Sequence, residues 1–409
     1  MTLANEADAG LRHADRFFIG GEWVTPSSNS RIDVIDSGTE EVFLSVAEAQ
    51  AEDIARSVAA AREAFDQGPW PRMTHAERAG YLRAIGGTLR ERGSEVAQLW
   101  PRESGVLYTI AQSAGADEAE TFNYYAGLAG SFPFEEPVQV AAPGEFGLIV
   151  REPVGVVGAI VPWNAPLTVI SYKIAPALLA GCTVVLKSSP EAPWEGYLIA
   201  EAAEAAGLPP GVLNVVLGLG PDVGTAIVAH PLVRKVAFTG SVRVGQEIGR
   251  IAADRILPLT LELGGKSANI VFADADLDFA ATEAVRAYAT NAGQVCSSGT
   301  RLLVQRPVQD RFVDAVVTAT RRLRPGRDVG PFPAPMGERV DELHRFDEVR
   351  GDAAAHQLAL AQGLAHQPEF ELFEVAQPAV KEFGRAAGRP GGEVACFEQG
   401  DRQPASGGV

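Results

Sequence analysis

The chain has 409 residues, with 35 basic and 52 acidic side chains and a formal net charge of −17. This length supports two or more domains, and the acidic balance argues against nucleic acid or anionic membranes as partners. Three widely spaced cysteines (Cys182, Cys296 and Cys396) fit neither a disulfide framework nor a metal cluster. A reduced cytoplasmic protein without a metal site is therefore expected. No apolar run approaches the roughly 20 residues that span a bilayer.

The N-terminal third combines short strands with helices. Two aromatic-rich runs around a Gly-Gly turn predict a hairpin, and apolar residues at helical spacing predict the helices. The expected elements are a hairpin over 17–24, a strand over 32–35, a helix over 51–67, and two or three helices within 75–127. A separate β-hairpin is predicted over about 137–150, where two strand-like runs flank the turn dipeptide Pro143-Gly144.

From Gly155 onward, apolar strands alternate with amphipathic helices. This alternation is typical of a parallel sheet covered by helices on both faces. The strands are expected at 156–161, 183–186, 212–216, 235–238 and 259–263, and the helices at 175–179, 197–206, 223–229 and 244–253. A second domain is expected to follow, with strands at 269–272 and 301–305 and a helix over 279–290.

The last part of the chain has a different composition. After Thr320 the sequence contains no isoleucine or threonine, residues that favour strands. Residues from about 330 onward are therefore predicted to be largely helical or disordered. An atypical or truncated C-terminal region is expected.

Cys296 is the strongest candidate for a catalytic residue. It lies between Gly293 and Gly299, and a thiolate at this position can attack a carbonyl carbon. The backbone N–H of Cys296 and the side-chain amide of Asn164 are candidate donors to the resulting oxyanion. Glu262 can activate the water that releases the acid, a task that an apolar setting beside Leu261 and Leu263 would favour. Cys182 and Cys396 fit the commoner role of a small buried apolar side chain.

Two glycine-containing turns follow predicted strands and are candidates for dinucleotide binding. Gly218 to Gly224 has a spacing close to the dinucleotide fingerprint, although alone it is weak evidence. Phe238, Gly240 and Ser241 join a strand to a helix, where backbone N–H groups can hold pyrophosphate. Lys187 ends a strand at the edge where open α/β sheets bind ligands.

These segments in this order resemble the aldehyde dehydrogenase superfamily over residues of about 17 to 325. The resemblance implies NAD(P)-dependent oxidation of an aldehyde to a carboxylic acid through a cysteine thiohemiacetal and thioester, with NAD as cofactor and NADP possible. It implies catalytic roles for Cys296, Glu262, Asn164 and Lys173. It implies cofactor contacts from Ile160, Pro162, Trp163, Lys187, Gly220, Phe238, Gly240, Ser241 and Leu263.

The resemblance also implies an architecture. Residues 1–262 are expected to form a Rossmann-like dinucleotide-binding domain that includes the hairpin at about 137–150, and in this family such a hairpin pairs subunits. Residues 263–409 are expected to form an α/β catalytic domain, incomplete and atypical from about 330. A homo-oligomer acting on a small-molecule aldehyde is the implied assembly.

Three departures from the family pattern leave alternatives open. Pro190 stands where many NAD-preferring members have a ribose-binding glutamate, Ala165 replaces a bulky aromatic residue, and a Glu-Glu-Ile-Phe-Gly-Pro segment is absent. One alternative is a CoA-acylating dehydrogenase, against which Glu262 argues because a thiol acceptor needs no activated water. The other is a catalytically impaired dinucleotide-binding remnant.

Overall fold

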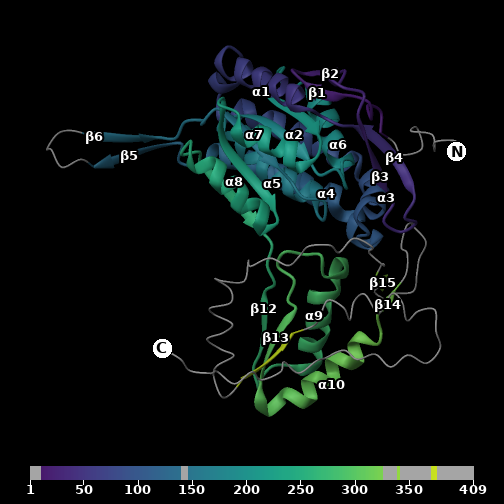
Figure 1. Cartoon of the computed structure of the whole chain (residues 1–409). Helices are drawn as coiled ribbons and strands as arrows, with labels where there is room; N and C mark the ends of the chain where they lie inside the picture. The colour runs from purple at the N-terminus through teal and green to yellow at the C-terminus, as the bar shows by residue number, and fades with distance from the viewer. Residues whose placement is uncertain (1–10, 140–145, 326–338, 341–369, 375–409) are drawn as a thin grey trace, which may run out of the picture. The chain divides into compact units, whose positions relative to one another are not determined.

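The computed structural model describes residues 11–139, 146–325, 339–340 and 370–374. Contacts divide the chain into two compact units, Met1–Glu262 and Leu263–Val409. Figure 1 shows the elements of each unit in chain order.

A seven-stranded sheet forms the centre of the first unit. Its order is β11-β10-β7-β8-β9-β1-β2, and the pairs β10–β7, β7–β8 and β8–β9 are parallel. The strands are β1 (Phe17–Ile19), β2 (Glu22–Val24), β7 (Val156–Ile160), β8 (Thr183–Ser188), β9 (Leu213–Leu217), β10 (Val233–Gly240) and β11 (Leu259–Leu263). Every residue of β7, β8 and β9 is buried, which agrees with their largely apolar sequence.

Helices cover this sheet on both sides (Figure 1). One group, which packs on β7 to β10, is α1 (Ala51–Asp66), α7 (Thr225–Ala229) and α8 (Val242–Ala253). The other is α5 (Pro166–Ala180) and α6 (Trp194–Ala205), which α2 (His75–Glu91), α3 (Gly93–Ser104) and α4 (Tyr108–Gly127) contact in turn. Short turns complete the unit: η2 (Trp70–Arg72), η3 (Leu128–Gly130) and η4 (Gly220–Gly224). The predicted α/β class with a helix-covered parallel sheet is confirmed.

Two hairpins lie outside the central sheet. The first pairs β3 (Arg31–Ile35) with β4 (Val42–Ala47), and β4 was not predicted from the sequence. The second pairs β5 (Glu135–Gln139) with β6 (Phe146–Val150) and extends away from the body of its unit (Figure 1). The Pro143-Gly144 turn expected between them lies outside the described residues.

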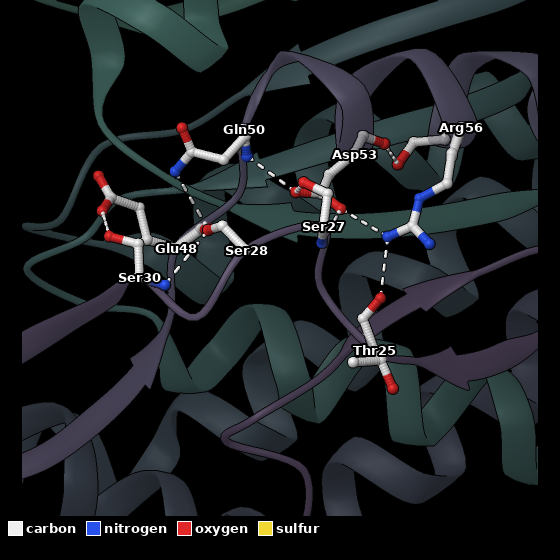
Figure 2. A network of polar contacts seen from close by, with 9 residues as sticks. Thr25, Ser27, Ser28, Ser30, Glu48, Gln50, Asp53 and Arg56 are labelled. Atoms are coloured by element: carbon white, nitrogen blue, oxygen red, sulfur yellow. Dashed lines mark hydrogen bonds and ion pairs between the residues drawn. The ribbon is translucent and has the colours of Figure 1, made fainter.

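The N-terminal strands are tied to α1 by a polar network around Asp53 (Figure 2). The buried Asp53 carboxylate accepts hydrogen bonds from the backbone N–H of Ser27 (2.9 Å), the Ser27 hydroxyl (2.7 Å) and the backbone N–H of Gln50 (2.8 Å). Arg56 bridges Asp53 Oδ1 (2.5 Å) and the carbonyl of Thr25 (2.9 Å). One side chain thus joins the loop after β2 to the first turn of α1.

The second unit has a smaller sheet of order β12-β13-β16. Its elements are β12 (Ala268–Val271), α9 (Leu277–Ala289), η5 (Thr290–Gly293), β13 (Arg301–Gln305), η6 (Arg306–Val308), α10 (Gln309–Thr320), β14 (Arg324–Pro325), β15 (Arg339–Val340) and β16 (Phe370–Glu374). β12 and β13 are parallel, and α9 and α10 pack together on an apolar core that includes Tyr288 and Phe312.

β16 differs from the prediction for the C-terminal region. The absence of isoleucine and threonine argued against strands there, yet Phe370–Glu374 pairs antiparallel with β13. The strand contains two phenylalanines, which also favour strands, and β13 offers it an open edge. The helix-like run at 353–363 lies outside the described residues, as does the tail from residue 375.

Candidate active site

The carboxyl ends of three parallel strands meet at one edge of the large sheet. Ile160 pairs with Lys187 on one side and with Phe238 on the other, so these three predicted cofactor residues lie in one row. Ligands bind at this edge in open α/β sheets. The structure therefore brings together residues that are far apart in the sequence.

Lys187 is buried at this edge, with 3% of its surface exposed. Its ammonium donates a hydrogen bond to the carbonyl of Ser188 at 3.0 Å. Burial lowers the pKa of Lys187 to about 8, and the charge of Glu191 opposes this shift. A buried ammonium at a ligand-binding edge can donate to the hydroxyls of a ribose.

Glycines open the backbone beside this row. A Cβ on Gly240 would lie 2.4 Å from the Phe238 ring, so a larger residue there would displace that ring. Gly220 begins η4, and a Cβ placed on it would meet no atom within 4 Å, which leaves open space at this turn. Ser241 precedes α8, and its Oγ accepts a hydrogen bond from the Val244 N–H at 3.3 Å. These residues suit the approach of a phosphate to a helix N-terminus.

Pro162, Trp163 and Asn164 form the turn between β7 and α5, where all three are half-buried. The Val161 N–H donates to the carbonyl of Lys187 at 3.2 Å and ties this turn to the neighbouring strand. Leu263, the last residue of β11, is half-buried as well.

Lys173 and Glu262 interact within the first unit. Lys173 lies on α5 with 9% of its surface exposed. Burial lowers the pKa of Lys173 to about 8, and the negative charge of Glu262 opposes this shift. Glu262 itself is exposed on β11, whereas Leu261 and Leu263 are half-buried. The expectation of an apolar setting was wrong here, because neighbouring side chains on a strand point to opposite faces.

Cys296 is exposed in the loop that follows a tight turn of the second unit. Three consecutive residues have left-handed backbone: Asn291 (φ 50°), Ala292 (φ 52°) and Gly293 (φ 76°). Glycine adopts this region freely, but for alanine it is unfavourable and must be enforced by surrounding contacts. Gln294 accordingly donates back to the Asn291 carbonyl through its backbone (2.9 Å) and its side chain (3.2 Å).

Lys266 holds this loop, a role that the sequence did not suggest. Its ammonium donates to the carbonyl of Val295, directly before Cys296, at 3.3 Å. Burial lowers the pKa of Lys266, an effect that the thiolate of Cys296 opposes. The Arg301 guanidinium donates to the Lys266 carbonyl at 3.1 and 2.8 Å. In the sequence, only the position of Lys266 four residues after Glu262 could have pointed to this role.

The other two cysteines have different settings. Cys182 is buried, burial raises the pKa of its thiol, and its carbonyl accepts a hydrogen bond from the Trp70 indole at 3.1 Å. Cys396 lies outside the described residues. Among the residues that the structure describes, no group of three or more His, Cys, Asp or Glu side chains could hold a metal ion. Within the same ranges, no helix has the length and apolar character needed to cross a bilayer.

Comparison with known proteins identifies the family of this chain. The model of the aldehyde dehydrogenase family matches residues 23–368. Geranial dehydrogenase of Castellaniella defragrans is 43% identical over 337 residues, which cover 81% of this chain and 70% of that protein. Betaine aldehyde dehydrogenase 1 of Oryza sativa is 41% identical and is covered to 62% of its length, with 75% of this chain matched.

Solved structures of aldehyde dehydrogenases resemble this chain in fold as well. An aldehyde dehydrogenase variant from Bacillus cereus superposes with a TM-score of 0.78 at 38% identity, covering 84% of this chain and 69% of that one. A variant of aldehyde dehydrogenase C from Pseudomonas syringae, in complex with NAD+ and octanal, gives 0.74 at 37% identity, covering 80% and 65%. The chain belongs to the aldehyde dehydrogenase family. It spans about 60–70% of the length of its first-ranked curated relatives.

Proposed function

We propose that this chain oxidises an aldehyde to a carboxylic acid, with NAD or NADP as the hydride acceptor, through a thioester on Cys296. The observation that carries the proposal is the exposed Cys296, which follows a strained turn in a loop whose Val295 carbonyl accepts a hydrogen bond from Lys266. Membership of the aldehyde dehydrogenase family supports the same chemistry.

Each proposed catalytic residue has a separate task. The Cys296 thiolate adds to the aldehyde carbon, and the amide of Asn164 together with the Cys296 N–H stabilises the oxyanion of the thiohemiacetal. A bound nicotinamide would supply the acceptor for the hydride that leaves this carbon. The Glu262 carboxylate then takes a proton from water, which attacks the thioester and releases the acid. Lys173, with its pKa lowered to about 8, is proposed to exchange protons with Glu262.

The residues at the edge of the large sheet fit a dinucleotide. We assign the adenosine ribose to Lys187, the pyrophosphate to Ile160, Pro162, Trp163, Phe238, Gly240 and Ser241, the adenine to Gly220, and the nicotinamide amide to the backbone of Leu263. The support is the row formed by Ile160, Lys187 and Phe238 and the open backbone at Gly220. Relatives from Pseudomonas syringae and Staphylococcus aureus have been solved with NAD+.

We further propose roles for the two parts of the chain and for the β5–β6 hairpin. Residues 1–262 would form the dinucleotide-binding domain and residues 263–409 the catalytic domain. The β5–β6 hairpin, with Phe146 and Val150 exposed, would pair subunits in a homo-oligomer. A cytoplasmic location is consistent with its free cysteines.

NADH formation from a panel of aldehydes tests the proposal. Cys296→Ser is expected to lower kcat by at least about 1,000-fold, because the thioester cannot form at a useful rate. The matched control is Cys182→Ser, which alters a buried thiol of the first unit and should retain most activity. Equal turnover by the parent and Cys296→Ser would refute the covalent mechanism.

The two alternatives have distinct signatures in the same assay. A CoA-acylating enzyme would require coenzyme A for turnover and release an acyl-CoA. A catalytically impaired remnant would bind NAD with no NADH production from any aldehyde. The exposed Cys296 favours the dehydrogenase over the remnant.

A further inference from the structure

A hollow adjoins Cys296 within the second unit. It has a volume of about 330 Å³, and both chain neighbours of Cys296, Val295 and Ser297, line it. Its other wall is α9, which contributes Glu283 and Arg286, together with the C-cap residue Thr290. This volume lies at the small end of the range for ligand pockets. The hollow is therefore large enough for a short molecule, and Val295 and Ser297 place it beside the Cys296 segment.

The polar residues of this wall lie at different distances along the axis of α9. Thr290, the C-cap of the helix, is nearest in sequence to the Cys296 loop, and its hydroxyl donates to the Arg286 carbonyl at 2.7 Å. At 1.5 Å per residue, Arg286 lies about 6 Å and Glu283 about 10 Å further along the axis. Of the two charged residues of this wall, Arg286 is therefore nearer to Thr290 along the helix axis than Glu283 is.

The Arg286 guanidinium is available to a ligand. Its Nη1 lies 3.9 Å from Glu283 Oε1, too far for a hydrogen bond, and the two side chains are 67% and 45% exposed. Such an exposed pair contributes little energy, so a better-placed carboxylate can displace Glu283. Lys266, which donates to Val295, adds a second positive charge near the thiol.

We infer that this hollow binds the distal end of a short aldehyde that carries a carboxylate, and that Arg286 determines the preference for this class. The inference rests on the proposed dehydrogenase function and names its substrate class. A guanidinium forms two parallel hydrogen bonds to a carboxylate and repels an ammonium. Short oxo acids are thus preferred over neutral aldehydes of equal length, and cationic aldehydes are disfavoured.

Substrates matched in chain length test this preference. The probes are 4-oxobutanoate, butanal and 4-(trimethylammonio)butanal, compared by kcat/KM. Arg286→Gln is expected to reduce the ratio of kcat/KM for 4-oxobutanoate to kcat/KM for butanal about fivefold, as for an exposed charge pair. Arg286→Glu should lower kcat/KM for the anionic substrate further and raise kcat/KM for the cationic substrate. The control is Arg311→Gln, which removes an exposed arginine of α10 in the same unit and should alter none of the ratios.

A second readout needs no turnover. Iodoacetate and iodoacetamide alkylate the same thiol but differ in charge, and the Cys296→Ser variant gives the background from other cysteines. At Cys296, the rate of alkylation by iodoacetate divided by the rate with iodoacetamide should fall about fivefold in Arg286→Gln and further in Arg286→Glu.

The two readouts separate the inference from the proposed function. If butanal is turned over but neither the substrate ratio nor the alkylation ratio depends on Arg286, the inference is overturned and the proposed function stands. An alkylation ratio that depends on Arg286, without turnover of any aldehyde, supports the anion-binding hollow and refutes the function. Unchanged ratios in both Arg286 variants overturn the inference whatever the activity.

Discussion

At the residue scale, the proposed site uses lysines in an environment that disfavours their charge. Lys173 and Lys187 are both buried, and burial lowers the pKa of each to about 8. Burying an ammonium costs free energy unless its donors find partners. A lysine with a pKa near 8 exchanges protons readily near neutral pH, which suits Lys173 beside the proposed base Glu262.

Replacement of Lys173 by methionine should remove a pH dependence of stability. The folded pKa of about 8 lies below the usual 10.5, so the unfolded chain binds more protons between these values and stability rises with pH across this window. Lys173→Met is therefore expected to be more stable than the parent at pH 7, by up to about 3 kcal/mol. Urea unfolding should show this advantage shrinking as the pH approaches 10.5. An advantage that does not change with pH would contradict the assignment.

At the element scale, α1 depends on the network in Figure 2. Asp53 caps the helix start and holds the loop after β2 at once. Burial opposes ionisation of Asp53, but hydrogen bonds from Gln50, Ser27 and Arg56 outweigh it and lower the pKa of the carboxyl. The ionised form is thus the one that the surrounding donors stabilise.

Asp53→Asn tests this network. The amide keeps the shape but loses the charge and one acceptor, so a loss of about 2 kcal/mol in unfolding free energy is expected at pH 7. Since the folded pKa lies below the usual 3.8, the contribution of Asp53 is present above that pH and is lost as pH falls through the folded pKa. Glu52→Gln, an exposed change in the same turn, should have almost no effect. Similar losses in both variants would argue against the network.

The turn before Cys296 is the second element with a distinct energetic role. Ala292 is held at φ 52°, where a β-carbon is unfavourable by roughly 1 kcal/mol. Ala292→Gly should therefore raise the unfolding free energy by up to about 1 kcal/mol. Ala289→Gly, three residues earlier in α9, should lower it by at least about 1 kcal/mol, because glycine disfavours helix. Thermal unfolding of both variants distinguishes the two effects, and destabilisation by Ala292→Gly would contradict the strain.

At the scale of the whole molecule, a pair of buried carboxyl groups joins distant parts of the first unit. Glu103 lies in the last turn of α3, and Glu195 lies in the first turn of α6. Glu103 Oε1 accepts a hydrogen bond from the Trp194 N–H at 3.0 Å. Within the described ranges, no hydrogen-bond donor reaches Glu103 Oε2 or either oxygen of Glu195. Burial raises the pKa of both groups, that of Glu195 to about 7, so a proton is retained between them.

Glu103→Gln should replace that proton with a permanent donor. Raised acid pKa values mean that the folded chain binds more protons than the unfolded one, so stability falls as pH rises from about 4.5 through 7. The variant is expected to be more stable than the parent at pH 8, by roughly 1–3 kcal/mol, and similar to it at pH 5. Urea unfolding at both values provides the measurement. A parent whose stability does not fall over this range would contradict the shared proton.

The sequence by itself determined the class of fold and the candidate chemistry. Alternation of apolar runs with helical periodicity placed β7 to β10 and their helices, because each pattern depends on residues close together in the chain. The segments around Cys296, Glu262, Asn164 and Lys187 were identifiable for the same reason, since each motif is local.

Tertiary structure alone decided which of these residues meet. Lys187 joins Ile160 and Phe238 through strand register, and Lys266 before β12 donates to the carbonyl of Val295 before β13. β16 found the edge of β13 although its surroundings argued against strands, and Glu262 is exposed although leucines flank it. Contacts between distant segments, burial and pKa shifts depend on how the elements pack, and no local pattern records that packing.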